Sequence, residues 1–288
     1  MKKGSLFNYE SLVHATAAVA GSTFALTTFY PLDMVKFRVQ LQDKDLSEKT
    51  TLQAIFHILK NEGITALYRG LRPTVTTMGV SNFVYFYTFH GMKGFVPEEM
   101  VNSRTDFVLS IIAGVANVLL TNPLWVANNR LKNKEEVPFT GLLDGMVHIA
   151  SVEGIPALWK GVFPSLMLVA NPAIHFTVYE ALKRRVKVNS ATGVFLLSAV
   201  SKSVATLLTY PLQLAQTRQR LMKKRLGTAA LLMTILKKQG AKGLYQGMES
   251  KLLQTVLATA LMFVMYEKIV QFVFKLLLGT AKRKALKG

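Results

Sequence analysis

The chain has 288 residues, of which 50% are hydrophobic and only 18% are charged, and its net charge is +19. A soluble domain of this size normally carries more charge, so the composition favours a membrane protein. The basic residues stand between apolar segments, which argues against nucleic acid and favours anionic lipids or anionic solutes as partners. The absence of cysteine excludes disulfides and thiolate metal sites.

Six apolar stretches are long enough to cross the hydrocarbon core, which takes about 20 residues of helix. In chain order they are Ser11–Leu32, Pro73–Met92, Phe107–Asn129, Gly161–Tyr179, Val188–Thr217 and Leu252–Tyr266, the last continuing to Phe274. The alternative is a large soluble bundle, but six such runs in so short a chain argue against it. We therefore predict an all-α membrane protein with six transmembrane helices.

A proline motif follows each odd-numbered span. Its first copy is Tyr30–Arg38 (YPLDMVKFR), and weaker copies are Asn122–Arg130 (NPLWVANNR) and Tyr210–Arg218 (YPLQLAQTR). The copies are about 90 residues apart, a period that indicates a repeat architecture. Proline inside a helix frees a backbone carbonyl and kinks the axis, so three such helices converging at one end would close a cup.

A second motif follows in each copy. Amphipathic segments at Leu52–Asn61, Leu142–Val152 and Thr228–Gln239 are expected to form short helices along the membrane surface. Each ends in a glycine, at Glu62–Gly63, Glu153–Gly154 and Gln239–Gly240, and an aromatic residue with a further glycine follows at Tyr68–Gly70, Trp159–Gly161 and Tyr245–Gly247. The order of motifs recurs three times, which places the repeats near residues 8–95, 104–186 and 190–274.

These motifs resemble those of the mitochondrial carrier family, and the resemblance covers nearly the whole chain. Four stretches resemble a peroxisomal branch that carries CoA, FAD, NAD and adenine nucleotides: Ser81–Phe89, Asn117–Thr121, Asn171–Ile174 and Lys251–Leu257. The resemblance implies a threefold pseudosymmetric bundle of six tilted helices with both termini toward the cytosol. It also implies alternating access around a central site, with these compounds as transported substrates and no cofactor bound permanently.

The resemblance assigns the residues after each proline to a gate on the organelle side, where acids and bases of neighbouring helices pair. Only Asp33 and Lys36 are charged at those places, and the amides there are Asn128, Gln213 and Gln216. Gln40 matches a glutamine that braces this ring in the family. We expect at most one ion pair, and hence a weak gate, because partly solvated pairs contribute about 0–1 kcal/mol. Alternatively, Asp33 and Lys36 only solvate a helix end.

The resemblance assigns a second gate, on the cytosolic side, to the ends of the even-numbered spans. Its residues are His90, Lys93, Glu180, Lys183 and Glu267. Only Glu180 and Lys183 form an intact acid and base pair, so this gate is also expected to be incomplete.

Lys202 is the one charged residue deep in an apolar span. It precedes Pro211 by about 13 Å of helix, and Gln213 follows it by about three turns, so Lys202 and Gln213 share a helix face. An ionisable side chain at such depth indicates a functional site, and a compact ammonium suits phosphate or carboxylate. The alternatives are a structural lysine bonded to backbone carbonyls and a lysine that extends toward the interface.

The resemblance places substrate contacts about two helical turns beyond Gly70, Gly161 and Gly247. The residues there are Thr77, Met78, Leu168, Val169, Gln254 and Thr255, or Met167 if the fourth span is shifted by one. Thr77 and Gln254 can hydrogen-bond a base or ribose, and Leu168 can pack against adenine. Asn82 and Tyr85 add a polar and an aromatic side chain on the second span. Each can equally be ordinary helix lining.

No phosphate loop, nucleophile triad or pair of catalytic carboxylates is present, so an enzyme has no positive support. His14 and His175 are isolated, and no metal site is expected. The expected function is exchange of adenine-containing cofactors across the peroxisomal membrane. The alternatives are a mitochondrial inner-membrane carrier of another nucleotide or cofactor and a non-transporting membrane adaptor. Expected partners are small anionic substrates, membrane lipids and peroxisomal membrane-protein import factors, with no nucleic acid and a monomeric chain.

Overall fold

The computed structural model describes residues 23–100, 102–133, 137–186, 191–222 and 226–261. Helices account for all the regular structure in this part of the chain, which confirms the predicted all-α class. The chain divides into two compact units, one of Pro31–Leu252 and one that combines Met1–Tyr30 with Leu253–Gly288. Most of the first predicted span and part of the last lie outside the described residues.

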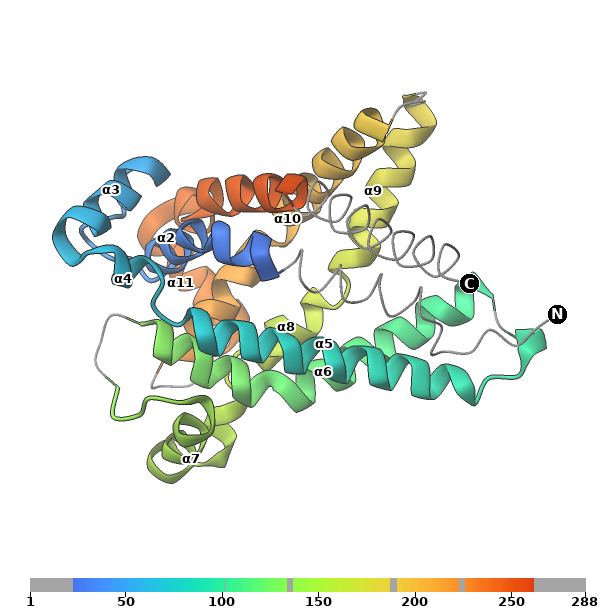
Figure 1. The fold of residues 1–288 in the computed structure, drawn as a ribbon, viewed down its shortest axis with the longest axis horizontal. Helices are drawn as coiled ribbons and strands as arrows, with labels where there is room; N and C mark the ends of the chain where they lie inside the picture. Colours follow the sequence, from blue (N-terminus) through green and yellow to red (C-terminus); the bar gives the residue numbers. More distant parts are fainter. Residues whose placement is uncertain (1–22, 101, 134–136, 187–190, 223–225, 262–288) are drawn as a thin grey trace, which may run out of the picture. The chain divides into compact units, whose positions relative to one another are not determined.

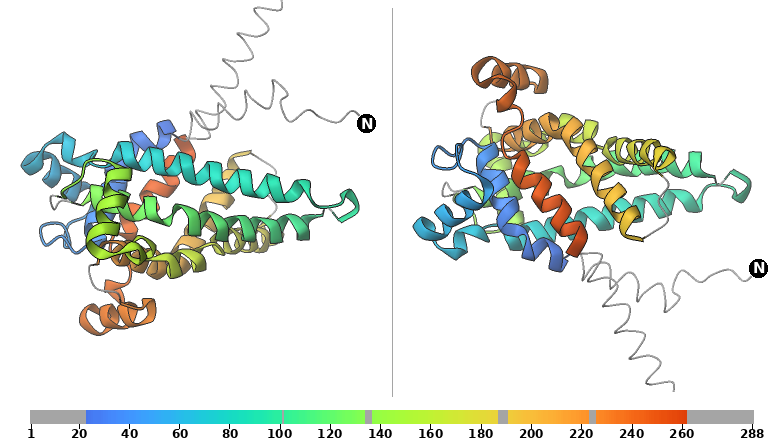
Figure 2. Two further views of the ribbon diagram at one scale, coloured as in Figure 1. Left: turned by 90° about the horizontal axis from the view of Figure 1, so that it is seen from below. Right: turned by 90° about the horizontal axis from the view of Figure 1, so that it is seen from above.

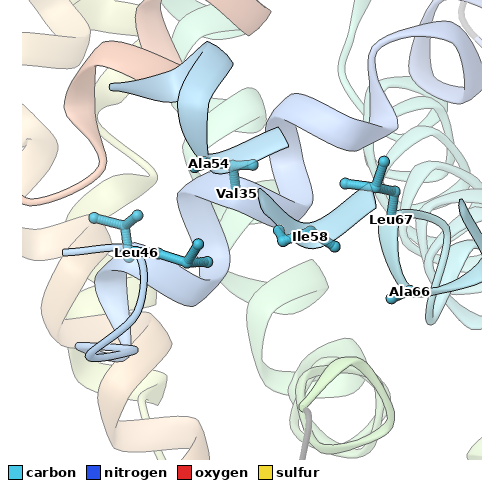
Figure 3. Close-up of a cluster of buried hydrophobic side chains, with 7 residues drawn as sticks. Val35, Leu46, Ala54, Ile58, Ala66 and Leu67 are labelled. Carbon is cyan, nitrogen blue, oxygen red and sulfur yellow. The ribbon is translucent and has the colours of Figure 1, made fainter. Parts of the chain in front are cut away.

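In the first repeat, helical residues 23–28 precede α2 (Tyr30–Gln40), α3 (Thr51–Glu62), α4 (Ile64–Leu67) and α5 (Leu71–Gly94). Thr50 starts α3 through a capping box with Gln53, in which each side chain accepts a hydrogen bond from the other residue's backbone N–H. Val35 of α2 packs with Ile58 of α3 and Leu67 of α4 in a buried apolar cluster (Figure 3). This cluster fixes the surface helix against the segment that follows the first proline.

The second and third repeats follow the same order (Figure 1). Their elements are η1 (Glu98–Met100), α6 (Ser103–Lys132), α7 (Leu142–Glu153), η2 (Ile155–Trp159), α8 (Val162–Leu168), α9 (Asn171–Arg185), α10 (Ala191–Leu221), α11 (Thr228–Gly243) and helical residues 248–261. Helices α5 and α6 lie side by side along most of their length (Figure 2), and α10 packs against both α8 and α9. The three amphipathic segments are therefore helical, as α3, α7 and α11, and their placement along a membrane surface stays a prediction.

The prolines act differently along the chain. Pro123 and Pro211 lie inside α6 and α10, as predicted, whereas α2 begins at Tyr30, directly before Pro31. The fourth predicted span is broken in two, because α8 ends at Leu168 and α9 begins at Asn171. Pro172 explains the break, since it lacks an N–H and its ring clashes with the carbonyl four residues earlier, that of Leu168.

Three described segments are long and apolar enough to cross a membrane. They are Ser103–Lys132, Ile155–Arg185 and Gly193–Leu221, with mean hydropathies of 1.8, 1.3 and 1.4. Helix α5 has 24 residues, which is sufficient length, but it is less apolar. The third, fourth and fifth predicted spans thus match these segments.

Candidate functional site

Asp33 on α2 binds two lysines. Its Oδ1 lies 2.6 Å from Lys36 Nζ on the same helix, and its Oδ2 lies 2.5 Å from Lys132 Nζ at the end of α6. Asp33 and Lys132 are both buried and belong to different repeats. One ion pair between repeats therefore does form after the prolines. Its base is Lys132, which lies one turn beyond Asn128 and was not among the predicted gate residues.

Lys132 belongs to a set of three equivalent residues. Sequence reasoning identified one of them, Gln40, and missed Lys132 and Arg220. Gln40, Lys132 and Arg220 stand at the same distance after their prolines. The Arg220 guanidinium lies 5.6 Å from the centre of the Trp125 ring, and Gln40 Nε2 donates to Tyr210 Oη at 3.1 Å. Each member of this set contacts the proline motif of the preceding repeat in the ring, so these residues form a layer of contacts between repeats.

The three amides predicted for the gate bind elsewhere. Asn128 Oδ1 accepts from Thr74 Oγ1 of α5 at 3.1 Å, and Gln216 Nε2 donates to Ser165 Oγ of α8 at 2.7 Å. The Gln213 amide donates to Thr209 in its own helix at 3.1 Å. Two of the amides thus tie helices of neighbouring repeats together, α6 to α5 and α10 to α8.

In the first two repeats, a third layer of contacts joins the proline motif to the amphipathic helix of the same repeat. Arg38 donates to both carboxylate oxygens of Glu62, at 2.8 and 2.5 Å. Arg130 likewise binds Glu153, which also accepts from Lys160 Nζ at 2.6 Å. Hydrogen bonds from Arg130 lower the pKa of the Glu153 carboxyl to about 2, so this acid stays charged at neutral pH.

The third repeat lacks this acid, because Gln239 takes its place. Arg218 instead donates to the backbone oxygen of Gln40 at 2.7 Å and to Gln246 Oε1 at 2.9 Å. The recurrence of arginine after all three prolines, with an acid in only two repeats, was the available sequence signal for these contacts. The loss of the acid turns the third arginine toward the first repeat.

Three glycines allow the repeats to approach closely. Gly70, Gly161 and Gly247 adopt positive φ angles of 73°, 75° and 80°, which favour glycine. A Cβ atom on Gly161 would lie 3.0 Å from the backbone oxygen of Gln216, and one on Gly247 would lie 2.9 Å from that of Lys36. Each glycine therefore packs against the gate segment of the next repeat.

Replacing Gly161 with alanine is expected to destabilise the protein by about 1–3 kcal/mol, because the new Cβ meets both backbone strain and the Gln216 carbonyl. The melting temperature of the purified protein in detergent measures this effect. Gly141→Ala is the matched control, since a Cβ at Gly141 meets no atom within 4 Å. Equal melting temperatures for both variants would contradict the close approach.

Two predicted substrate contacts line a cavity. Leu168 and Val169 border a space of about 500 Å³, together with Tyr85 of α5 and Asn117 of α6. Its lining is mostly apolar and aromatic with a few polar groups, which is typical of ligand sites. The prediction that Leu168 and Val169 face a substrate is compatible with this placement.

Comparison with known sequences assigns the chain to a family. A family profile described as "Mitochondrial carrier protein" matches residues 7–100, 99–190 and 187–276. The chain belongs to the mitochondrial carrier family. It is therefore a transporter and not an enzyme, and the triplicated motifs are those of a carrier.

Individual relatives cover almost the same span. The mouse protein "Peroxisomal membrane protein PMP34" is 44% identical, over 94% of this carrier and 96% of the relative. "Peroxisomal adenine nucleotide carrier 1" of Glycine max is 29% identical, over 90% of this carrier and 91% of the relative. "Peroxisomal nicotinamide adenine dinucleotide carrier" of Arabidopsis thaliana is also 29% identical, over 94% of this carrier and 98% of the relative.

The described residues that the sequence predicts for a cytosolic gate contact near neighbours along the chain. Lys93 on α5 pairs with Asp106 in the first turn of α6, at 2.7 Å, a partner that sequence reasoning missed. Glu180 lies 4.0 Å from Lys183 within α9. Between α5 and α9, the described residues form no ion pair, and Glu267 lies outside the described residues. His90 stacks on Phe86 in its own helix, with ring centres 6.4 Å apart.

The other predicted substrate residues occupy varied places. Lys202 is exposed on α10 and has no acidic partner among the described residues. Thr77 is fully buried and its hydroxyl has no hydrogen-bond partner within the described ranges, whereas Asn82 is exposed and Met78 is partly buried. Gln254 and Thr255 lie on helical residues 248–261, beyond Leu252 and so in the other compact unit. Their shared role in one site stays a prediction.

Proposed function

We propose that this carrier exchanges adenine-containing cofactors, namely CoA, FAD, NAD and the nucleotides AMP and ADP, across the peroxisomal membrane by alternating access. Lys202 carries the proposal, because it is a cation within an apolar span and has no acidic partner among the described residues. A lysine in that environment needs an anion, and these substrates are polyanions. Small anionic solutes and lipids are accordingly its partners.

The cavity beside Leu168 and Val169 supports the nucleotide part of the proposal. Its apolar wall and the Tyr85 ring suit the face of a planar base, and Asn117 offers an amide close by. Thr77 needs a movement of α5 before its hydroxyl can reach a ligand, because it is fully buried. We therefore assign base recognition to the residues of this cavity.

The relatives support the proposed substrate class and the proposed peroxisomal location. The names of the soybean and Arabidopsis relatives include adenine nucleotide and nicotinamide adenine dinucleotide, and all three relatives are named as peroxisomal. Transport of CoA and FAD rests on the resemblance of four short stretches alone. Monomeric function and recognition by peroxisomal membrane-protein import factors are part of the same proposal.

Uptake into liposomes tests this function. The purified carrier should take up labelled CoA, FAD, NAD and ADP faster when the liposomes contain unlabelled substrate than when they are empty. Uptake of none of these compounds would reject the proposal. Equal uptake into loaded and empty liposomes would replace exchange with uniport.

A tagged carrier at low expression is expected to co-localise with a peroxisomal matrix marker. The family profile and the peroxisomal relatives support this location. Fluorescence microscopy against peroxisomal and mitochondrial markers measures it. A purely mitochondrial signal would favour the inner-membrane alternative.

A further inference from the structure

A second cavity, the vestibule, lies where α2, α6 and α10 end. It has a volume of about 400 Å³ and shares no lining residue with the cavity beside Leu168 and Val169. The segments after the three prolines each contribute the residue at the tenth place after the proline, namely Leu41, Asn133 and Leu221. A solute that passes between the repeats on the organelle side of the proposed gate therefore meets the vestibule.

Arg218 is the one charged side chain among the described residues that line the vestibule. Its counterparts in the first two repeats, Arg38 and Arg130, each bind a carboxylate. Arg218 instead donates to two neutral groups, the Gln40 backbone oxygen at 2.7 Å and Gln246 Oε1 at 2.9 Å. Within the described ranges, no acid pairs with Arg218.

The missing acid leaves a positive charge beside the vestibule. Gln239 stands where the first two repeats have glutamate, and its Oε1 is buried with no hydrogen-bond partner in the described part of the chain. Arg218 is half-buried, and a positive charge away from bulk water is costly unless it is paired. An anion in the vestibule would remove that cost.

Arg218 also caps the end of α2. In the first two repeats, the basic residues Arg69 and Lys160 donate to backbone oxygens just beyond the ends of α6 and α10, at 3.3 and 2.7 Å. The equivalent residue of the third repeat is the neutral Gln246, so Arg218 supplies the cation that binds the last carbonyl of α2, that of Gln40. An anion that draws Arg218 away from Gln40 would release the end of α2.

We propose that Arg218 binds a phosphate group of the substrate in the vestibule, and that it exchanges its bond to Gln40 for this phosphate when α2 moves away. A planar guanidinium can donate to two phosphate oxygens at once. The proposal rests on the proposed function for its ligand, since every proposed substrate carries phosphate. It adds an anion site separate from Lys202 and links occupation of that site to release of α2.

Binding of inorganic phosphate tests the residue. In a Lys202→Ala background, which lacks the other proposed anion site, phosphate should still raise the melting temperature, and Arg218→Gln should weaken this binding about ten- to a hundredfold. Arg218→Lys should retain part of it. Lys237→Gln in the same background is the matched control, because Lys237 is an exposed lysine of α11. Undiminished phosphate binding in a folded Arg218→Gln protein would overturn the proposal.

Gln239→Glu tests the cause with Arg218 intact. The new carboxylate stands where the first two repeats have theirs, so it should pair with Arg218, raise the melting temperature without phosphate and weaken phosphate binding. Gln239→Met adds no charge and should leave phosphate binding at the parental level. Phosphate binding that Gln239→Glu does not change would overturn the proposal, as would binding of an anionic phospholipid in place of phosphate.

The side of substrate entry separates this proposal from the proposed function. Arg218→Gln should raise the KM for ADP about tenfold for entry from the organelle side and leave the KM for cytosolic entry at the parental value. An equal change on both sides would identify a structural arginine and overturn the site. If phosphate binding depends on Arg218 but no adenine cofactor is transported, the anion site stands and the proposed function is rejected. If cofactors are transported and phosphate binding does not depend on Arg218, the proposed function stands and the vestibule site is rejected.

Discussion

Asp33→Asn is expected to weaken the proposed gate on the organelle side strongly. Asp33 is buried and is the shared partner of Lys36 and Lys132, so its loss leaves two ammonium groups side by side. Removing one partner of a buried ion pair costs about 3–5 kcal/mol, because the remaining charge is no longer paired. The melting temperature should fall, and labelled substrate should leak from liposomes that lack counter-substrate.

A double substitution tests whether the loss of stability comes from unpaired charge or from altered packing. Asp33→Asn combined with Lys132→Met should recover part of the lost stability, because one unpaired ammonium is then absent. Asp45→Asn is the control, since Asp45 is an exposed acid near the end of α2. Parental leak and melting temperature in the Asp33→Asn protein would mean that the Asp33 pairs do not hold the gate.

Lys202→Ala is expected to abolish or greatly weaken transport of CoA and nucleotides while the protein remains folded in the membrane. One charge-assisted contact is worth about 1.5–3 kcal/mol, or about ten- to a hundredfold in substrate affinity. Lys202→Arg should keep part of the activity, because its longer planar group replaces a compact charge. Uptake into liposomes and thermal stabilisation by CoA measure the two effects.

Lys238→Ala provides the matched control for Lys202, because Lys238 is an exposed lysine on α11. A Lys202→Ala protein with both the parental melting temperature and parental stabilisation by CoA would reject a substrate role. A Lys202→Ala protein that fails to fold would instead identify a structural lysine.

Local features of this carrier could be predicted because local signals set them. The helix stops at Gly63 and Gly154 have φ angles of 83° and 86°, as the Glu–Gly pairs indicated, and α3 and α7 lie within one residue of their expected bounds. The break before Pro172 was also open to local reasoning, since proline cannot continue the hydrogen bonding of α8. The break was missed because the fourth span was predicted from the length of its apolar run alone.

The gate contacts could not be predicted as well, because they depend on how neighbouring repeats are rotated. The sequence predicted at most one ion pair and identified no base on another repeat for Asp33, whereas the packing of Gly70 against Lys132 brings that base from one turn beyond Asn128. Trp125 stands three residues before Asn128 in the second proline motif, and the Arg220 guanidinium lies over its ring, a contact that no local pattern indicated. These contacts compensate in part for missing charges, and the weak coupling expected from sequence stays a prediction.

The glycine contacts also determine the order in which the bundle can be completed. Gly70 meets the second repeat and Gly161 meets the third, so these two contacts can form as each repeat is added. The contact of Gly247 with Lys36 and the bond from Gln40 to Tyr210 require the third repeat to return to the first. A nascent chain of two repeats therefore exposes the end of α2. Completion of the chain covers that surface, so a truncated carrier differs from a finished one in the exposure of α2.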